Sequence, residues 1–213
     1  MNYKIYCIKL SKFPFKGSKV FNFTTLGASG RLGPTSLGNH YQGKLHEHQV
    51  TLLNGIQQWT APMTGQYQIE AVGASGGYDT SANSKAYRGL GAQMIGTFTL
   101  NKDQVVKILV GQEGGINTAS SSSGGGGGTF VVQGNTPLIV AGGGGGVESA
   151  TSRHSANCDA SSSTTGRTGY GGLSWAGGTG GYGATTADAG NSGGGGGGFY
   201  SNGRSNKTFW WFF

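Results

Sequence analysis

Three histidines and two serines are the residues of this chain whose spacing could carry chemistry. His46 and His48 stand two positions apart, which would place both on one side of an extended segment, and His40 lies nearby in the sequence. A zinc site needs three or four protein ligands, and no cysteine lies close to these histidines. We therefore predict an exposed loop pair at His46 and His48, and we predict no metal ligands.

The two serines lie in Gly-x-Ser-x-Gly patterns, around Ser75 and around Ser192. In hydrolases this pattern forms a sharp turn between a strand and a helix, which aims the serine at a histidine. The residues after Ser75 lack the apolar period of a helix, and the 8 acidic residues form no evident carboxylate pair. The sequence thus predicts no catalytic residue and no cofactor-binding site, and the chain is not expected to be an enzyme.

Glycine limits the elements that could position any such residues. The chain has 213 residues, of which 45 are glycine, 4 proline and 2 cysteine, and only 11% are charged. Each glycine inside a helix costs about 1 kcal/mol relative to alanine, which excludes a helical bundle. The glycines come in blocks rather than at every third position, which excludes collagen, and two cysteines cannot build a disulfide scaffold. An all-β core with glycine-rich insertions remains.

The formal net charge of +7 is concentrated at the start of the chain. Five lysines and no acidic residue precede residue 20, which leaves 10 basic and 8 acidic residues in the rest. A nucleic-acid-binding protein needs basic residues clustered on a folded face, so we expect no nucleic-acid partner. We predict that residues 1–19 are a basic tail, either unstructured or wrongly assigned to the coding sequence, which would bind acidic glycans if it binds anything.

Targeting signals are absent from the sequence as it stands. Lysines interrupt the first 13 residues, so they lack the apolar stretch of a signal peptide, and no run approaches the 18 apolar residues of a membrane span. Two Asn-x-Thr sequons, at Asn22 and Asn206, would accept glycans if the chain were secreted. Cys7 and Cys158 are too few to indicate a redox compartment.

Alternating apolar and polar residues predict short antiparallel strands over the first two thirds of the chain. In 66–72, Tyr67, Ile69 and Ala71 fall on one face, as expected of a strand with one buried side. Turn residues separate strands at a spacing typical of an antiparallel sandwich or jelly roll. The predicted strands are 20–25, 55–60, 66–72, 92–100, 104–110, 129–133 and 138–141.

Three glycine blocks interrupt this pattern, at 124–128, 142–146 and 193–198. A Ser/Thr/Gly-rich stretch, 147–192, lies between the last two. Flexible linkers are the interpretation that composition alone favours. The alternative is that extended glycine segments, which lack Cβ atoms, pack side by side through backbone hydrogen bonds. The residues leave both interpretations open.

Five motifs in a fixed order make the chain recognisable. They are FNFTTLGASGRLGPT (21–35), GIQQWTAPMTGQYQIEAVGASGG (55–77), ILVGQ (108–112), GGGGGTFVV (124–132) and PLIVAGGGGG (137–146). In this order they resemble the glycine-rich extracellular region of the anaplastic lymphoma kinase and leukocyte tyrosine kinase receptors. The resemblance extends over about residues 21–204.

The resemblance implies a fold. It is an all-β, tumour-necrosis-factor-like (TNF-like) antiparallel sandwich with an inserted bundle of polyglycine-type extended helices. The glycine-rich domain would span 20–204, with a β core mainly at 20–141 and a Gly/Ser/Thr-rich part at 142–204. Gly73, Gly76 and Gly77 would allow strand ends to turn where a Cβ does not fit. The further implied structural residues are Trp59, Tyr67 and Ile69 in the core, with Pro62, Gly65 and Gly111 elsewhere in the motifs.

The resemblance also implies a function, although this sequence departs from the receptor sequences at several points. In the receptors this region is extracellular and, with a cysteine-rich module, takes part in ligand recognition and dimerisation. Here Leu26 replaces a receptor cysteine, and the His-Arg-Asp, Asp-Phe-Gly and Ala-Pro-Glu kinase signatures are missing, so the chain cannot transfer phosphate. We expect a non-catalytic extracellular module, either a fragment or a stand-alone relative, that recognises a protein ligand or self-associates. The alternative is a structural or adhesive glycine-rich surface or matrix protein.

The last residues, KTFWWFF at 207–213, depart from the glycine-rich pattern. Glycine GGT codons read one base out of frame give TGG, the tryptophan codon. A Phe-Gly-Gly-Phe segment would then become Phe-Trp-Trp-Phe, which is the sequence of 209–212. We hypothesise that 205–213 is an aberrant or truncated C-terminus; otherwise its aromatic residues would form an adhesive patch.

Overall fold

The computed structural model of the chain describes residues 8–13, 19–78, 87–118, 123–146, 155–168, 176–185 and 196–203. These residues contain β-strands and one helical turn. In chain order they are β1 (Ile8–Phe13), β2 (Val20–Phe23), β3 (Val50–Leu53), β4 (Ile56–Thr60), β5 (Gly65–Val72), β6 (Gln93–Leu100), β7 (Val105–Leu109), β8 (Thr129–Gln133), β9 (Thr136–Ala141) and α1 (Ser155–Cys158).

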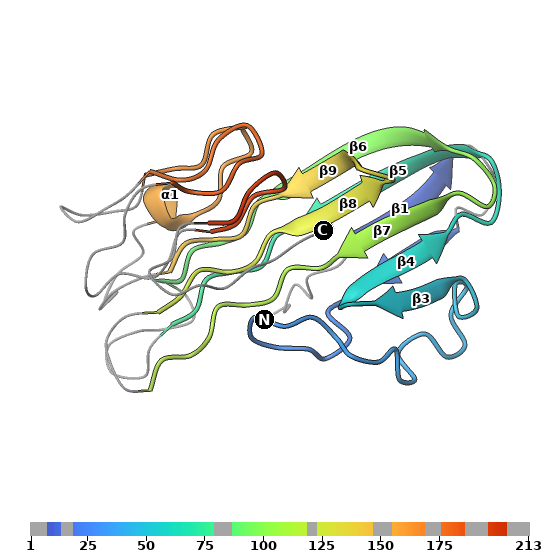
Figure 1. Cartoon of the computed structure of the whole chain (residues 1–213), viewed down its shortest axis with the longest axis horizontal. Helices are drawn as coiled ribbons and strands as arrows, with labels where there is room; N and C mark the ends of the chain where they lie inside the picture. Colours follow the sequence, from blue (N-terminus) through green and yellow to red (C-terminus); the bar gives the residue numbers. More distant parts are fainter. Residues whose placement is uncertain are drawn as a thin grey trace.

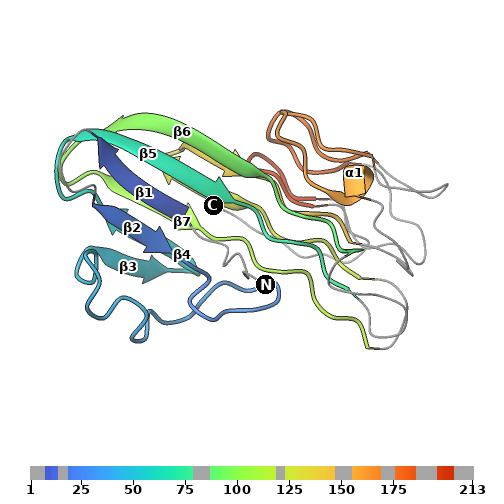
Figure 2. The same cartoon turned by 180° about the vertical axis from the view of Figure 1, so that it is seen from behind.

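Two antiparallel sheets form the folded core, which we call the sandwich. One has the strand order β2-β1-β5-β6 and the other the order β3-β4-β7-β8-β9. Figures 1 and 2 show the two sheets lying face to face, with the second sheet in front in Figure 1 and behind in Figure 2. The prediction of an all-β protein with antiparallel sheets is therefore confirmed.

Large apolar side chains fill the space between the two sheets. Trp59 of β4 and Tyr67 of β5 are both fully buried, and their rings meet edge to face with centroids 5.7 Å apart. Ile69 of β5 and Ile108 of β7 are also fully buried. Burying a large apolar side chain stabilises a fold by roughly 1.5–3 kcal/mol. The alternation in the sequence thus reflects a genuine inner face on each sheet.

All seven predicted strands are present, with their ends shifted by up to two residues. β3 is one of two strands of the sandwich that the sequence analysis missed, and β1 is the other. β3 pairs with β4 across Asn54 and Gly55, which both have positive φ, of 51° and 80°. An Asn-Gly pair with this geometry is a strong signal for a two-residue hairpin. Pro137 lies within β9, where it is tolerated because β9 is an edge strand.

β1 corrects the prediction of an unstructured tail before residue 20. It lies inside its sheet, between β2 and β5, with Leu10 opposite Phe21 and Ile69, and Lys9 opposite Asn22. In the sequence IKLSKF, Ile and Leu alternate with Lys and Ser over residues 8–11, which is the period of a strand, and Lys12 and Phe13 break this alternation. The prediction is wrong for residues 8–13; most of the other tail residues lie outside the described residues.

Two further expectations concern segments beyond the sandwich. Within the described part of the chain, no helix has the length and apolarity needed to cross a membrane. The aromatic end, residues 207–213, and the sequon at Asn206 lie outside the described residues. The first half of the third glycine block, 193–195, does too, since the description resumes at residue 196.

Candidate functional site

Five extended segments continue the strands β5 to β9 beyond one end of the sandwich. They are the segment that follows β5 (73–78), the one that leads into β6 (87–92), the one that follows β7 (111–117), the one that leads into β8 (123–128) and the one that follows β9 (142–146). Figure 1 shows them running side by side away from the sheets. We call these five segments the glycine bundle.

Backbone hydrogen bonds in the bundle recur at every third residue of its central segment, 73–78. The amides of Gly73 and Gly76 both donate to the segment that leads into β6, over 2.9 Å each. One position later, the amides of Ala74 and Gly77 both donate to the segment that leads into β8, over 3.0 and 2.8 Å. A β-strand, by contrast, has a period of two. The central segment therefore has a threefold repeat in its contacts.

The carbonyl groups of the central segment bond to the two remaining segments. Ala74 accepts a hydrogen bond from Gly144 over 2.8 Å, and Ser75 accepts one from Gly114 over 3.0 Å. Outer segments also bond to one another, since Gly126 donates to Gly144 over 2.8 Å. One segment thus has four bonded neighbours, so the bundle is packed in two dimensions and is not a further sheet.

Close approach of backbones explains the glycines of the bundle. A Cβ added at Gly73, Gly76, Gly77 or Gly111 would lie 2.0 to 2.1 Å from a backbone carbonyl oxygen of a neighbouring segment. None of these four residues has a positive φ. The resemblance implied that the first three allow strand ends to turn, but the chain stays extended there. What excludes a side chain is the neighbouring backbone.

The other residues that the resemblance singled out belong to the sandwich. Trp59, Tyr67 and Ile69 are fully buried between the sheets. Pro62 and Gly65 lie at the connection between β4 and β5 and are half-buried. These residues serve packing and chain direction, and none of them lies at a site that could perform chemistry.

Ser75 lies inside the bundle and is only 3% exposed. The chain remains extended from β5 through Tyr78, so Ser75 does not stand on a sharp turn between a strand and a helix. That turn is what exposes the nucleophile of a hydrolase. The geometry therefore gives Ser75 a place in backbone packing, and Ser192 lies outside the described residues.

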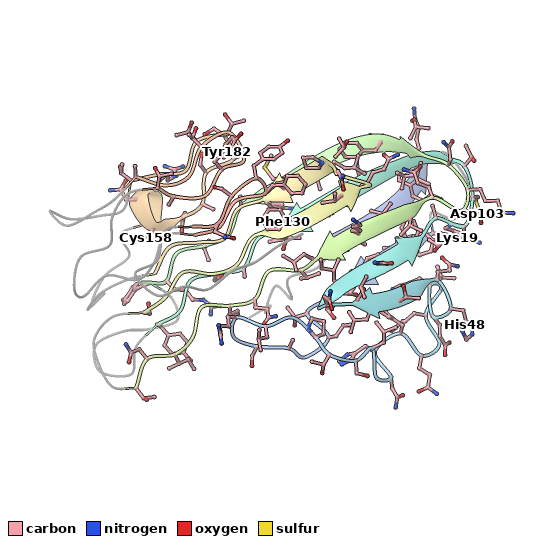
Figure 3. All side chains as sticks on the ribbon, viewed as in Figure 1. Lys19, His48, Asp103, Phe130, Cys158 and Tyr182 are labelled. Carbon is pink, nitrogen blue, oxygen red and sulfur yellow. The ribbon has the colours of Figure 1, made fainter. Side chains whose placement is uncertain are left out.

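The three histidines singled out in the sequence differ in their exposure to solvent. His48 and His40 are exposed, and Figure 3 shows His48 at the outer edge of the molecule, whereas His46 is 2% exposed. The prediction of an exposed pair is therefore wrong for His46. Over the described residues, no group of three or more His, Cys, Asp or Glu side chains could hold a metal ion.

Aromatic rings enclose His46. The ring centroids of Tyr41 and Phe23 lie 4.5 and 4.9 Å from that of His46. Nε2 of His46 is 3.0 Å from the carbonyl oxygen of Asn22, and since a carbonyl only accepts, Nε2 carries the proton. The buried Nδ1 has no hydrogen-bond partner among the described residues. Burial lowers the pKa of His46 below 6.5, and it outweighs the opposing bond to Asn22.

A buried polar pair fixes the same loop to the sandwich. The Tyr41 hydroxyl donates to Oε1 of Gln57, and Nε2 of Gln57 donates to the carbonyl oxygen of Thr24 over 2.8 Å. Burial raises the pKa of Tyr41 well above its usual range, which keeps the hydroxyl protonated and able to donate. These bonds satisfy polar groups that would otherwise destabilise the core.

Loop 24–49 also borders an open hollow on the surface. Leu26, Leu32, Pro34 and His40 contribute to its lining. Among the described residues that line this hollow, His40 is the only titratable one. One histidine without a second acid or base is a poor basis for general acid–base catalysis. The hollow therefore offers a lining that mixes apolar and polar groups.

Asn22 is the sequon residue whose position the structure gives. It lies in β2, an edge strand, and it is exposed because its neighbours Phe21 and Phe23 face the core. An edge position on the outer face would leave room for a glycan.

Comparison with known proteins relates part of the chain to a receptor. No protein-family model matches the chain. Over 106 residues the chain is 42% identical to the leukocyte tyrosine kinase receptor of Mus musculus, a match that covers 46% of this chain and 11% of the receptor. The chain thus spans about a tenth of the length of this curated relative. The match supports a relation to that receptor family over part of the chain. No kinase domain is evident in the small all-β fold of the described residues.

Proposed function

We propose that this chain is a non-catalytic extracellular recognition or assembly module, related to the glycine-rich ectodomain of receptor tyrosine kinases. The observation that carries the proposal is the 42% identity over 106 residues to the leukocyte tyrosine kinase receptor. Ser75 and the described histidines contribute to packing or lie apart, which agrees with a non-catalytic role.

For the architecture, we propose a TNF-like sandwich that carries polyglycine-type helices. A threefold extended helix has no internal hydrogen bonds, so all its amides are available to neighbouring segments. The threefold repeat at Gly73 and Gly76, and again at Ala74 and Gly77, supports this assignment of the bundle. The domain would extend over 20–204, with β1 added to its β core and the Gly/Ser/Thr-rich part at 142–204.

For the setting, we propose an extracellular or cell-surface location with a protein partner, either a ligand or a second copy. Secretion can be tested at Asn22, which is exposed. A glycan at this residue would require passage of the chain through the secretory pathway. Acidic glycans are a further candidate partner, through the lysines before residue 20.

Secreted expression tests the module. The chain is produced in animal cells behind an added signal peptide and analysed by size-exclusion chromatography with light scattering. A recognition module gives a monomer or a small discrete oligomer, with a glycan at Asn22 that the variant N22Q lacks. Failure to secrete the folded chain, or open-ended assembly, would contradict the proposal.

The matrix or adhesive role remains the second candidate, because one edge of the bundle is accessible. Gly115 and Gly124 are exposed, and no atom lies within 4 Å of a Cβ added at either. A second chain could add a segment there through backbone hydrogen bonds. Assembly that grows with concentration, and that is weakened by Gly124→Val, would favour this role over the module.

A further inference from the structure

Among the described strands, four form the edges of the two sheets, and three of these carry a feature that disfavours pairing with another chain. The edge strands β2 and β3 have only four residues each. β9 contains Pro137, which has no amide hydrogen to donate, and its register with β8 shifts between Val131 and Val132. Short strands, prolines and such irregularities are the means by which natural sheets avoid edge-to-edge association.

The fourth edge strand, β6, carries none of these features. It has eight residues, QMIGTFTL, with no proline and no charged side chain. All eight pair with β5 in one unbroken register, and no other described strand pairs with β6. Figures 1 and 2 both show β6 along the upper rim of the sandwich. One row of its backbone amides and carbonyls therefore faces outward over about 27 Å.

The side chains of β6 that point to solvent can pair with their own kind. These exposed positions alternate along the strand and are Gln93, Ile95, Thr97 and Thr99. Gln and Thr both donate and accept hydrogen bonds, so an identical strand offers each of them a partner. A charged side chain would instead meet its own charge across the pair. The edge is thus self-complementary, which is what a two-fold contact between identical chains requires.

The inner side of β6 also has apolar surface left to bury. Met94 and Phe98 pack against the core, yet both are only partly buried. Their partners across β5, Ala71 and Tyr67, are fully buried, since β5 has a strand on each side. A strand added beside β6 would cover what remains of Met94 and Phe98.

We propose that β6 pairs antiparallel with β6 of a second copy of this chain, with Thr97 opposite Thr97, so that two four-stranded sheets become one continuous sheet. The buried side of β6 must stay buried in both copies, so paired residues are an even number of positions apart. The register centred on Thr97 meets this condition. It places Ile95 opposite Thr99, and Phe98 opposite Gly96, where the absent side chain leaves room for a ring.

The pairing rests on the assembly role within the proposed function, and it names the partner and the contact. The partner is a second copy because every pair that this register forms joins side chains that β6 itself supplies. It also explains why the longest edge strand of the described sheets is the one without a protective feature.

A charge exchange at Thr97 tests the pairing in the full chain. Light scattering at micromolar concentrations should show a dimer. Thr97→Lys and Thr97→Glu each place like charges opposite one another, and each should raise the dissociation constant of the dimer by about 100-fold or more. An equal mixture of the two variants should dimerise again, because an ammonium group then faces a carboxylate. A monomeric parent chain, a dimer that Thr97→Lys leaves intact, or a mixture that stays monomeric would overturn the proposal.

The matched control is Leu53→Lys, which adds the same charge to an exposed side chain on the edge strand β3. It should leave the dissociation constant of the dimer unchanged, and an equal weakening by Leu53→Lys would contradict a contact at β6. The test also separates this proposal from the proposed function. A secreted and glycosylated chain that stays monomeric would overturn the β6 pairing and leave the recognition module standing, whereas open-ended assembly would contradict both.

Discussion

The sandwich and the glycine bundle bury their backbones by opposite means. In the sandwich, side chains such as Trp59 and Tyr67 fill the space between two sheets, which stand well apart to hold them. In the bundle, neighbouring backbones approach so closely that a Cβ at Gly76 would lie 2.0 Å from a carbonyl oxygen. One region is stabilised mainly by apolar burial and the other by backbone hydrogen bonds.

The comparison shows why the bundle depends on the sandwich. A backbone hydrogen bond contributes about 0.5–1.5 kcal/mol net, while ordering a glycine costs about 0.5–1 kcal/mol more than ordering an alanine. A bundle of glycine segments therefore has little stability of its own. Each of its five segments continues a strand of the sandwich, from β5 to β9, and the sheets thus set which segments lie side by side.

The largest effect is expected from the sandwich core. Trp59→Ala should lower the free energy of unfolding by about 3–5 kcal/mol, because it leaves a cavity between the sheets. Denaturant unfolding measures the loss. Leu53→Ala is the matched control on the neighbouring strand, since Leu53 is 57% exposed, and it should change stability by less than about 0.5 kcal/mol. Similar losses for both variants would mean that the sandwich is not held by its inner face.

We expect the thermal stability of the sandwich and loop 24–49 to depend on pH. His46 has a folded-state pKa below the unfolded value of 6.5, so the unfolded chain binds a proton more readily. The stability from neutral His46 is complete above pH 6.5 and is lost as pH falls through the lowered folded-state pKa. Tm measured from pH 7.5 to 5 should fall, and His46→Gln should flatten this fall while His48→Gln should not. An equal slope in His46→Gln would contradict the assignment.

The smallest effect is expected where a side chain supports the bundle. Oδ1 of Asp159 accepts a hydrogen bond from the amide of Leu90 over 2.8 Å. Asp159→Ala should cost about 0.5–1.5 kcal/mol and speed amide exchange in the segment that leads into β6. Asp159→Asn keeps an acceptor oxygen and should therefore lower the free energy of unfolding by less than Asp159→Ala does. If Asn and Ala behave alike, this bond contributes nothing to the bundle.

The sandwich was largely predictable, because its strands carry side chains that reveal their period. The segment 66–71 alternates residue by residue, and it lies in β5, Gly65–Val72. β1 was missed because its lysines were counted as charge and because its alternation of apolar and polar residues covers only 8–11. The burial of His46 could not be predicted, since it depends on rings from β2 and from its own loop.

The bundle could not be predicted in the same way, because glycine has no side chain to reveal a period. Gly76 and Gly115 are the same residue type in similar surroundings of the sequence. In the structure one is enclosed by backbone, while the other has open space where a Cβ would lie. Only the contacts between segments that are far apart in the chain separate them. The choice between linker and packed segment therefore required the structure.

The same two glycines allow the most direct test of the central claim, that close backbone contact holds the bundle together. Gly76→Ala and Gly115→Ala add the same methyl group, and neither residue has a positive φ. We predict that Gly76→Ala lowers the free energy of unfolding by about 1–3 kcal/mol, whereas Gly115→Ala leaves it unchanged or raises it by about 0.4–1 kcal/mol. Hydrogen exchange on both proteins should show faster exchange of the Ala74 and Gly77 amides in Gly76→Ala alone, with the exchange of β4 unchanged. Equal stability and equal exchange in the two variants would contradict the account.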